Sequence, residues 1–370
     1  MSPEMRSIHV LQPAIPTYRH DFFERLSRAF PDRFFVHASQ QDLGALTATS
    51  NTFSWQRALG PIKSIAPGVS WQVGAVGLPI RRGDILILSG APRTLSNIIL
   101  MLRARFIGAH VVWWGHYLSP NSPFWRRTLR ILLMRAAQGV LLYTDAEIAA
   151  YRQSWLGRRD TRPLQALNNG LNIDPIDQHR EAYDANNRPK DMLFIGRLSE
   201  KARIDVAIEA LADDRLSDVR LQVIGEGETE ATARQLADHL GVAGRIVWNG
   251  ALTDEAEIGS IANRCRVFLY PGDVGLSLIH GLAYGLPAVV HDDTASHMPE
   301  IAAFEAGVNG RTFRRGDADD LAGAVDSVIH DAPYLARLSE SALMTVSSGY
   351  NTENMTKRFL EMIAAVLTMP

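Results

Sequence analysis

The chain has 370 residues, of which 46% are apolar and 21% are charged, and its formal net charge is -2. This length allows two domains with sizeable cores, and the lack of overall positive charge argues against a nucleic-acid partner. The single cysteine, Cys265, excludes an internal disulfide framework and indicates a reducing compartment. No uninterrupted apolar run reaches about 18 residues, so no transmembrane helix is expected.

Short apolar runs mark the expected strands of the first half. A continuous apolar run bounded by turn residues is typical of a strand buried in a parallel sheet. Helical patterns alternate with these runs, one of them over about 94–106, whereas residues 40–78 alternate only weakly and predict no clear element. The runs predict strands at 8–11, 33–39, 84–90, 109–116, 139–144 and 164–167.

Polar side chains follow the first of these strands, and a histidine is the last residue of the fourth strand. Tyr18, Arg19 and His20 lead into the first helix, and His116 closes the strand at 109–116. Sites of α/β sheets usually lie at the carboxyl ends of strands, which makes His116 a candidate site residue. Helix capping and solvent exposure explain the first three residues equally well, and a lone histidine is often structural.

Residues 124–138 predict a basic amphipathic helix. Arg126, Arg127 and Arg130 alternate with apolar residues such as Leu129. Such a helix can lie on an anionic membrane surface, or it can pack its apolar side on a sheet and leave its arginines in solvent. We expect a packed helix, with membrane attachment as an additional role.

A strand followed by a basic turn opens the second half, after the polar, proline-bearing segment 173–190, which is the expected linker. The strand places Arg197 at its end, and Lys201 and Arg203 come just before the next helix. A cation near a helix N-terminus is unfavourable unless an anion is present. The pattern therefore predicts an anion beside Arg197, and solvated charges at a helix start are the alternative.

Three further strands of the second half end in glycine-bearing turns. The strand at 219–224 is followed by Gly225, the strand at 245–248 by Asn249 and Gly250, and the strand at 267–270 by Gly272. Gly275 then opens a helical pattern that ends at Gly285 and Pro287. Such a turn leaves backbone N–H groups free beside the positive end of a helix, which suits phosphate. An ordinary strand–turn–helix unit is the alternative.

These motifs together resemble family 4 glycosyltransferases, which are retaining enzymes of the GT-B fold. Gly196-Arg197-Leu198 and Gly285-Leu286-Pro287 match the family's pattern. The usual glutamate pair is absent, since its positions fall at Gly272, beside Asp273, and at His280. The form PGxVGLxxIH resembles a bacterial subgroup that carries this sequence in place of the glutamates.

The resemblance implies roles for individual residues. Arg197 corresponds to the family's diphosphate-binding arginine. The family's lysine position is Ala202 here, so we favour Lys201 as the second cation. A histidine at the position of His116 contacts the sugar and phosphate in related enzymes. The implied catalytic residues are His116, Arg197 and Lys201. The implied donor-binding residues are Gly196, Arg203, Gly225, Asn249, Gly250, Gly272, Asp273, Gly275, Leu276, His280 and Glu300, and the implied acceptor-side residues are Tyr18, Arg19 and His20.

We therefore predict an α/β protein of the GT-B fold, with two Rossmann-like parallel-sheet domains that face each other across a cleft. The expected boundaries are 1–172 for the acceptor-side domain, 173–190 for the linker and 191–350 for the nucleotide-sugar domain. Residues 351–370 form a final helix that returns to the first domain, as in GT-B enzymes.

The expected activity is retaining transfer of a hexosyl unit from a nucleotide-diphosphate sugar to a hydroxyl of a glycan or lipid-linked acceptor, in bacterial cell-surface polysaccharide or glycoconjugate synthesis. No cofactor and no metal are expected, because no ligand cluster has metal-site spacing. The expected location is cytoplasmic, with attachment to the inner membrane face as an option. The alternatives are a sugar-nucleotide epimerase or phosphorylase on the same fold, and a non-catalytic nucleotide-sugar-binding subunit.

Overall fold

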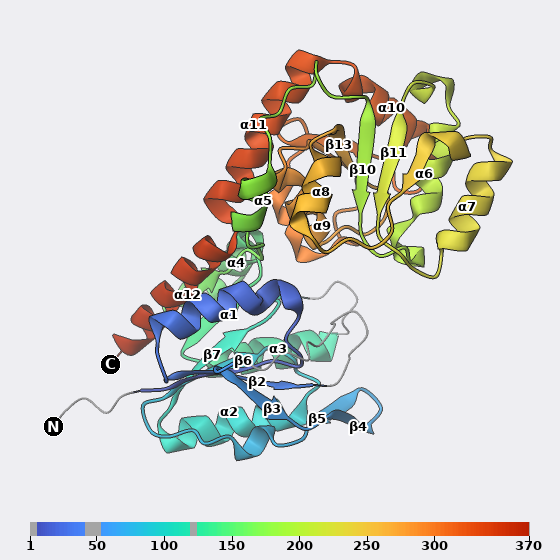
Figure 1. The fold of residues 1–370 in the computed structure, drawn as a ribbon. Helices are drawn as coiled ribbons and strands as arrows, with labels where there is room; N and C mark the ends of the chain where they lie inside the picture. Colours follow the sequence, from blue (N-terminus) through green and yellow to red (C-terminus); the bar gives the residue numbers. More distant parts are fainter. Residues whose placement is uncertain (1–5, 41–52, 119–123, 370) are drawn as a thin grey trace. The chain divides into compact units, whose positions relative to one another are not determined.

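The computed structural model describes residues 6–40, 53–118 and 124–369, and the chain folds into two compact units (Figure 1). The first unit comprises residues 1–168 and 352–370, and the second comprises residues 169–351. The carboxyl-terminal helix therefore belongs to the same unit as the first strands of the chain.

A parallel sheet of seven strands forms the centre of the first unit, with the order β3-β2-β1-β6-β7-β8-β9. Val10 in β1 lies opposite Val36 on one side and Ile87 on the other, so apolar residues pair across this strand on both sides. The strands are β1 (Ile8–Leu11), β2 (Phe34–Ser39), β3 (Gln56–Leu59), β6 (Ile85–Ser89), β7 (His110–Trp114), β8 (Gly139–Leu142) and β9 (Leu164–Ala166).

Residues 53–72 hold three strands that the sequence pattern did not predict. β3 lies at the edge of the sheet, and β4 (Ile62–Ala66) and β5 (Val69–Gln72) form a separate antiparallel hairpin. β3 and β4 are mostly exposed, so they carry few of the apolar residues from which a buried strand is recognised.

Helices cover both faces of the first sheet. One apolar layer joins the sheet to α1 (His20–Ala29) and α12 (Thr352–Leu367), through side chains such as Phe22 and Phe359. The other layer joins it to α2 (Leu95–Ile107), α3 (Phe124–Ala136) and α4 (Asp145–Gln153). The sheet is thus buried on both faces, which explains its continuous apolar strands.

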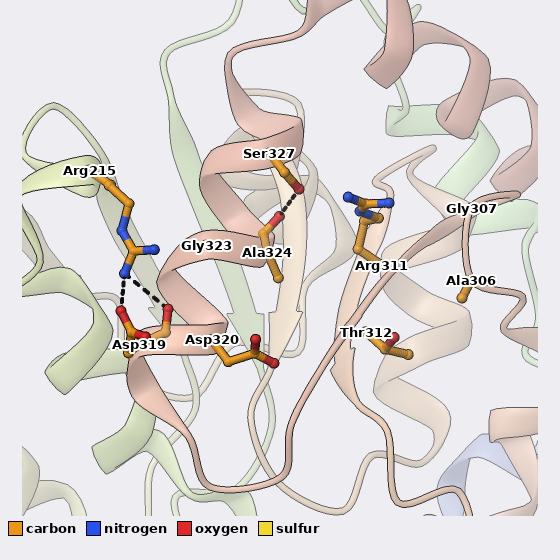
Figure 2. Close-up of a pocket in the computed structure, with 10 residues that line it drawn as sticks. All are labelled: Arg215, Ala306, Gly307, Arg311, Thr312, Asp319, Asp320, Gly323, Ala324 and Ser327. Carbon is orange, nitrogen blue, oxygen red and sulfur yellow. Dashed lines mark hydrogen bonds and ion pairs between the residues drawn. The ribbon is translucent and has the colours of Figure 1, made fainter.

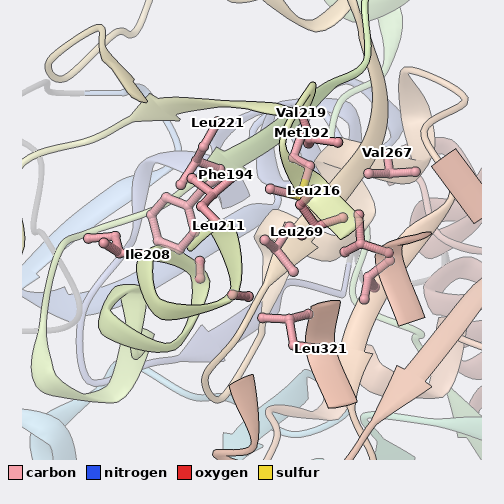
Figure 3. Close-up of a cluster of buried hydrophobic side chains, with 14 of the residues drawn as sticks. Met192, Phe194, Ile208, Leu211, Leu216, Val219, Leu221, Val267, Leu269 and Leu321 are labelled. Carbon is pink, nitrogen blue, oxygen red and sulfur yellow. The ribbon is translucent and has the colours of Figure 1, made fainter. Parts of the chain in front are cut away.

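The second unit contains a parallel sheet of six strands with the order β12-β11-β10-β13-β14-β15. Met192 and Phe194 of the central strand belong to one buried apolar cluster with Ile208 and Leu211 of the following helix and with Leu321 (Figure 3). The strands are β10 (Asp191–Ile195), β11 (Arg220–Ile224), β12 (Ile246–Trp248), β13 (Cys265–Tyr270), β14 (Ala288–His291) and β15 (Gly310–Phe313).

Two apolar clusters lie on the two faces of this second sheet and join it to its helices. The predicted α/β class with two Rossmann-like units is therefore confirmed. The helices are α5 (Asp174–His179), α6 (Ile204–Leu211), α7 (Glu230–His239), α8 (Glu255–Ala262), α9 (Leu276–Ala283), α10 (Ala318–Ile329) and α11 (Ala332–Gly349).

The segment that we expected to be a linker, 173–190, is packed onto the second unit. It contains α5, which contacts α8. The Tyr183 hydroxyl donates to the backbone oxygen of Arg266 at 2.7 Å, and the Arg188 guanidinium donates to that of Cys265 at 3.0 Å. The chain enters the second unit at residue 169, well before β10.

No helix within the described ranges combines the length and the apolar character that crossing a lipid bilayer requires.

Candidate functional site

Three strand ends of the second unit are in direct backbone contact. A Cβ atom at Gly225 would lie 1.9 Å from the Gly196 oxygen, and Gly225 has a φ of 142°. The Gly225 N–H donates to the Gly250 oxygen at 2.8 Å. Any side chain at Gly225 would separate these segments, so glycine is required where the ends of β10, β11 and β12 meet.

Arg197 and Lys201 place two exposed cations just after β10. Within the described part of the chain, neither side chain makes a hydrogen bond or ion pair. Ala202, at the position for which the sequence resemblance implies a lysine, is a small apolar side chain that is fully buried. The two cations are therefore available to an anion.

Arg203 differs from its two neighbours, because it already has an anionic partner. Its guanidinium lies 3.0 Å from the Asp205 carboxylate, and this hydrogen bond raises the pKa of the arginine. Arg203 also has a φ of 50°, in the left-handed region. Its charge is thus largely offset, which makes it a weaker candidate for the diphosphate than Arg197 or Lys201.

The loop after β13 is tied to the Lys201 turn. A Cβ atom at Gly272 would lie 1.8 Å from the Lys201 oxygen, and the Asp273 N–H donates to the same oxygen at 3.0 Å. Gly272, at a position for which the sequence resemblance implies a glutamate, therefore packs directly against the backbone of the neighbouring turn.

The Asp273 carboxylate lies in a cluster of charged and imidazole side chains. It accepts from Arg315 at 2.9 Å, and one of its oxygens lies 3.4 Å from His291 Nε2. The His291 ring stacks on His297 with centroids 3.8 Å apart. Burial, with His297 and Arg315 nearby, lowers the pKa of His291 to about 4. Asp273 is thus ion-paired before any donor binds.

The glycine turn before α9 faces a buried carboxylate. Gly275 precedes Leu276, the first residue of the helix, and a Cβ atom at Gly275 would lie 3.7 Å from Glu300 Oε2. Glu300 is only 6% exposed, and its Oε1 accepts from the Asn169 side chain at 2.8 Å. Glu300 therefore lies beside the Gly275 turn, and its contact with a donor stays a prediction.

His280 is held by α8. Its Nε2 lies 2.9 Å from Glu255 Oε1, and the Tyr284 hydroxyl donates to the same oxygen at 2.6 Å. Burial raises the pKa of Glu255, but the hydrogen bonds with His280 and Tyr284 outweigh burial, and the net shift is downward. The donor contact implied for His280 stays a prediction, and in this structure its hydrogen-bond partner is on α8. Glu255 was missed because its partners are 25 and 29 residues away in the sequence.

The Asn249 side chain contacts neighbouring groups at the strand ends. Its amide nitrogen lies 3.3 Å from the side-chain oxygen of Gln222 and 3.3 Å from the backbone oxygens of Val223 and Val247. These contacts position the turn that leads to Gly250.

In the first unit, His116 follows β7 and pairs with a glutamate. Its Nδ1 lies 3.2 Å from Glu147 Oε1, and its ring lies 4.4 Å from that of Tyr143. The carboxylate also accepts from the backbone N–H groups of Tyr117 and Tyr143. Glu147 was missed, although Thr144 three residues before it forms the Thr-x-x-Glu pattern of a helix capping box, and Thr144 does accept from the Glu147 N–H at 3.1 Å.

The predicted acceptor-side residues lie at the start of α1. Arg19 is 6% exposed, and its guanidinium carbon lies 4.6 Å from the ring centre of Trp114, the last residue of β7. Tyr18 is half-buried beside it, and burial lowers the pKa of His20, whose ring lies 4.7 Å from that of Phe53. Arg19 thus lies against the strand that leads to His116.

A cavity of about 440 Å³ lies between α10 and the edge strand β15 (Figure 2). Arg215 on one side of it bonds with Asp319, and Arg311 and Thr312 project from the strand. None of the predicted site residues lines this cavity, so it is separate from the candidate site.

A smaller cavity of about 420 Å³ adjoins the Arg203–Asp205 pair. Among the residues that the structure describes, no three histidine, cysteine or acidic side chains are grouped so that they could hold a metal ion.

Comparison with known proteins finds similar sequences and structures. Residues 175–344 match the family model "Glycosyl transferases group 1". The chain is 25% identical over 349 residues to the lipopolysaccharide core biosynthesis glycosyltransferase LpsE of Rhizobium meliloti (strain 1021), an alignment that covers 90% of this chain and 95% of LpsE.

Two solved structures share the fold. A glycosyltransferase from Rickettsia africae aligns with a TM-score of 0.73 and 14% identity over the whole of both chains. Anabaena Alr3699/HepE in complex with UDP aligns with a TM-score of 0.70 and 16% identity over 98% of this chain and all of HepE. The fold is therefore GT-B, and the comparisons as a whole support a glycosyltransferase.

Proposed function

We propose that this chain is a retaining glycosyltransferase that moves a hexosyl unit from a nucleotide-diphosphate sugar to a hydroxyl of a glycan or lipid-linked acceptor. LpsE, the relative that aligns along nearly the whole chain, is named for lipopolysaccharide core synthesis. By this similarity the product belongs to a bacterial cell-surface polysaccharide or glycoconjugate. The acceptor then lies at the cytoplasmic face of the membrane, where the arginines of α3 add positive charge.

The observation that carries this proposal is the pair of exposed cations after β10. Arg197 and Lys201 lie in the segment that matches the family model and have no anionic partner among the described residues. A diphosphate leaving group gains negative charge as the bond between the sugar C1 and its oxygen breaks. Positioned cations stabilise that charge more in the transition state than in the bound substrate, which raises the rate.

The proposed chemistry needs no protein nucleophile and no metal. The departing phosphate oxygen takes the proton of the acceptor hydroxyl, whose oxygen forms the new bond to C1 on the same face of the sugar. Arg197 and Lys201 supply the charge stabilisation. His116, oriented by Glu147 through a 3.2 Å contact, is the polar group assigned to the sugar hydroxyls and phosphate.

The test is nucleoside diphosphate release from a panel of nucleotide sugars, with and without acceptor. Arg197→Ala is expected to lower turnover about 10²–10³-fold, as loss of one charge-stabilising donor does, while the melting temperature stays unchanged because the side chain is exposed. Arg234→Ala is the matched control, since Arg234 is an exposed arginine on α7 that pairs with Glu230. Normal turnover of a folded Arg197→Ala protein would exclude the diphosphate assignment.

The same assay separates the alternatives. An epimerase or phosphorylase would convert the nucleotide sugar without a glycan acceptor, and a non-catalytic binding subunit would release no nucleotide under any condition.

A further inference from the structure

Helix α2 exposes a stripe of large apolar side chains. Leu95, Ile99, Leu102 and Phe106 are 38%, 37%, 61% and 93% exposed. At 3.6 residues per turn these four positions fall within about 60° of one another and extend along about 17 Å of the helix. They form one continuous face, which we call the α2 stripe.

The opposite face of α2 is already used by the fold. Leu100, Met101 and Ala104 are buried against the first sheet. A surface helix normally presents polar residues outward, and a helix that is apolar on both faces is normally covered on both. Within the described ranges the outward face stays open to solvent, so the α2 stripe indicates a binding partner.

The chain around α2 is strongly basic, although the whole protein is slightly acidic. Residues 85–144 contain no aspartate, glutamate or lysine. Over the same residues the sequence has seven arginines, at positions 93, 103, 105, 126, 127, 130 and 135. The local charge is therefore +7 within a protein of net charge -2.

Exposed arginines lie around the α2 stripe. Arg93 comes just before the helix, and Arg105 lies on it, about 60° around from Leu102 at the edge of the stripe. Arg82 packs beside Gly108 at the helix end, where its Cγ would lie 3.3 Å from an added Cβ. An apolar face bordered by arginines is the arrangement of a helix that lies in the interface of an anionic bilayer.

We propose that the α2 stripe rests in the surface of an anionic lipid bilayer, with Arg82, Arg93 and Arg105 at the level of the lipid phosphates. The charge of this region selects this partner: a second copy of the chain would bring like charges together, and a nucleic acid would leave Leu102 and Phe106 without an apolar contact. The inference shares with the proposed function only a membrane-bound acceptor, and vesicle binding is measured without any sugar transfer.

This assignment changes the part expected of residues 124–138. Leu133 and Met134 of α3 are buried in the first unit, and burial lowers the pKa of Arg130. α3 therefore packs on the sheet, as expected, and contributes charge, while α2 supplies the apolar contact.

The experiment is co-sedimentation of the full chain with vesicles of phosphatidylcholine alone or mixed with phosphatidylglycerol. The wild type is expected to bind only the mixed vesicles. The double variant Leu102→Gln/Phe106→Gln is expected to lower the partition coefficient about 100-fold, since it removes two large apolar side chains from the contact. Arg82→Gln, Arg93→Gln and Arg105→Gln are each expected to lower it about fivefold.

The controls distinguish the α2 stripe from other exposed apolar side chains and from loss of folding or activity. Met344→Gln on α11 alters an equally exposed side chain of the second unit (63%) and should bind as the wild type does. Circular dichroism and transfer to a water-soluble acceptor report whether each variant is folded and active, so a failed membrane assignment is distinct from a failed enzyme assignment.

Three results would overturn the proposal. The first is a wild type that never sediments with anionic vesicles. The second is a variant Arg126→Gln/Arg127→Gln/Arg130→Gln that loses binding while Leu102→Gln/Phe106→Gln retains it. The third is a wild-type dimer in solution that the Leu102→Gln/Phe106→Gln substitutions convert to a monomer, because a second copy would then cover the stripe.

Discussion

Gly272 is the point of closest approach between the loop after β13 and the Lys201 turn. We predict that Gly272→Ala lowers both donor affinity and stability, because its Cβ would lie 1.8 Å from the Lys201 oxygen and one of the two backbones must move. Overpacking of this kind typically costs about 1–3 kcal/mol. Titration with nucleoside diphosphate and thermal unfolding measure the two effects.

Gly244→Ala is the matched control for this substitution. Gly244 has no atom within 4 Å of an added Cβ and no positive φ. The Gly244→Ala substitution should leave the donor affinity and the melting temperature unchanged. If Gly272→Ala behaves in the same way, the contact of Gly272 with the Lys201 turn is unimportant.

The contact of His280 with Glu255 gives a prediction about charge. His280→Glu would place a second carboxylate beside the Glu255 oxygen that accepts from His280 and Tyr284. Two carboxylates that share one site repel each other, and we expect a loss of about 1–3 kcal/mol in unfolding free energy, the cost of a polar group that loses its partner. His280→Gln keeps an N–H donor and should be milder. The comparison is made by urea unfolding, and a His280→Glu protein as stable as His280→Gln would contradict the assignment.

At the scale of elements, α12 completes the core of the first unit from the other end of the chain. Phe359 is fully buried, and its ring lies 5.8 Å from that of Phe22 on α1. We predict that Phe359→Ala destabilises the first unit by about 3–5 kcal/mol, the usual cost of such a cavity. Lys357→Ala, at an exposed position of the same helix, is the control.

Tryptophan fluorescence is a suitable measurement for this variant, because six of the seven tryptophans lie in the first unit and only Trp248 lies in the second. If Phe359→Ala unfolds at the same midpoint as the wild type in this signal, α12 is dispensable for the stability of the first unit.

For the whole molecule, buried neutral histidines make stability dependent on pH. Burial, with His9 and Arg57 nearby, lowers the pKa of His37 to about 3 in the first unit, and that of His291 in the second unit is about 4. Both values lie below the ordinary histidine pKa of 6.5. The unfolded chain therefore binds more protons as the pH falls from about 6.5 toward 4, and folding is weakened there by up to about 1.4 kcal/mol per pH unit for each histidine.

We therefore expect a lower melting temperature at pH 5 than at pH 7. His291→Phe keeps a ring of similar size but cannot be protonated, so its melting temperature should fall less over the same range. An identical fall in the variant and the wild type would exclude His291 as a source of this acid sensitivity.

Apolar runs in the sequence were sufficient to predict six strands of the first sheet and the Rossmann-like class, because strands buried on both faces must be apolar along their whole length. β3 and β4 escaped prediction because their side chains are largely exposed and give no such pattern. β5 is only partly buried, and its four residues include two polar side chains, so it forms no continuous apolar run either. The place where the chain enters the second unit was also hidden, since 173–190 is polar in composition yet packs through Tyr183 and Arg188.

The sequence by itself indicated the glycine turns after the strands and the two cations after β10, Arg197 and Lys201, since each depends on a short-range motif whose chemistry can be read in order. Only the tertiary structure decided which side chains meet across long separations: Glu147 with His116, Glu255 with His280, and Arg315 with Asp273. It also decided that α2 leaves four large apolar side chains between about a third and almost fully exposed. The physical reason is that local pattern sets an element's type, whereas packing alone sets which of its faces is covered and which partner each polar group finds.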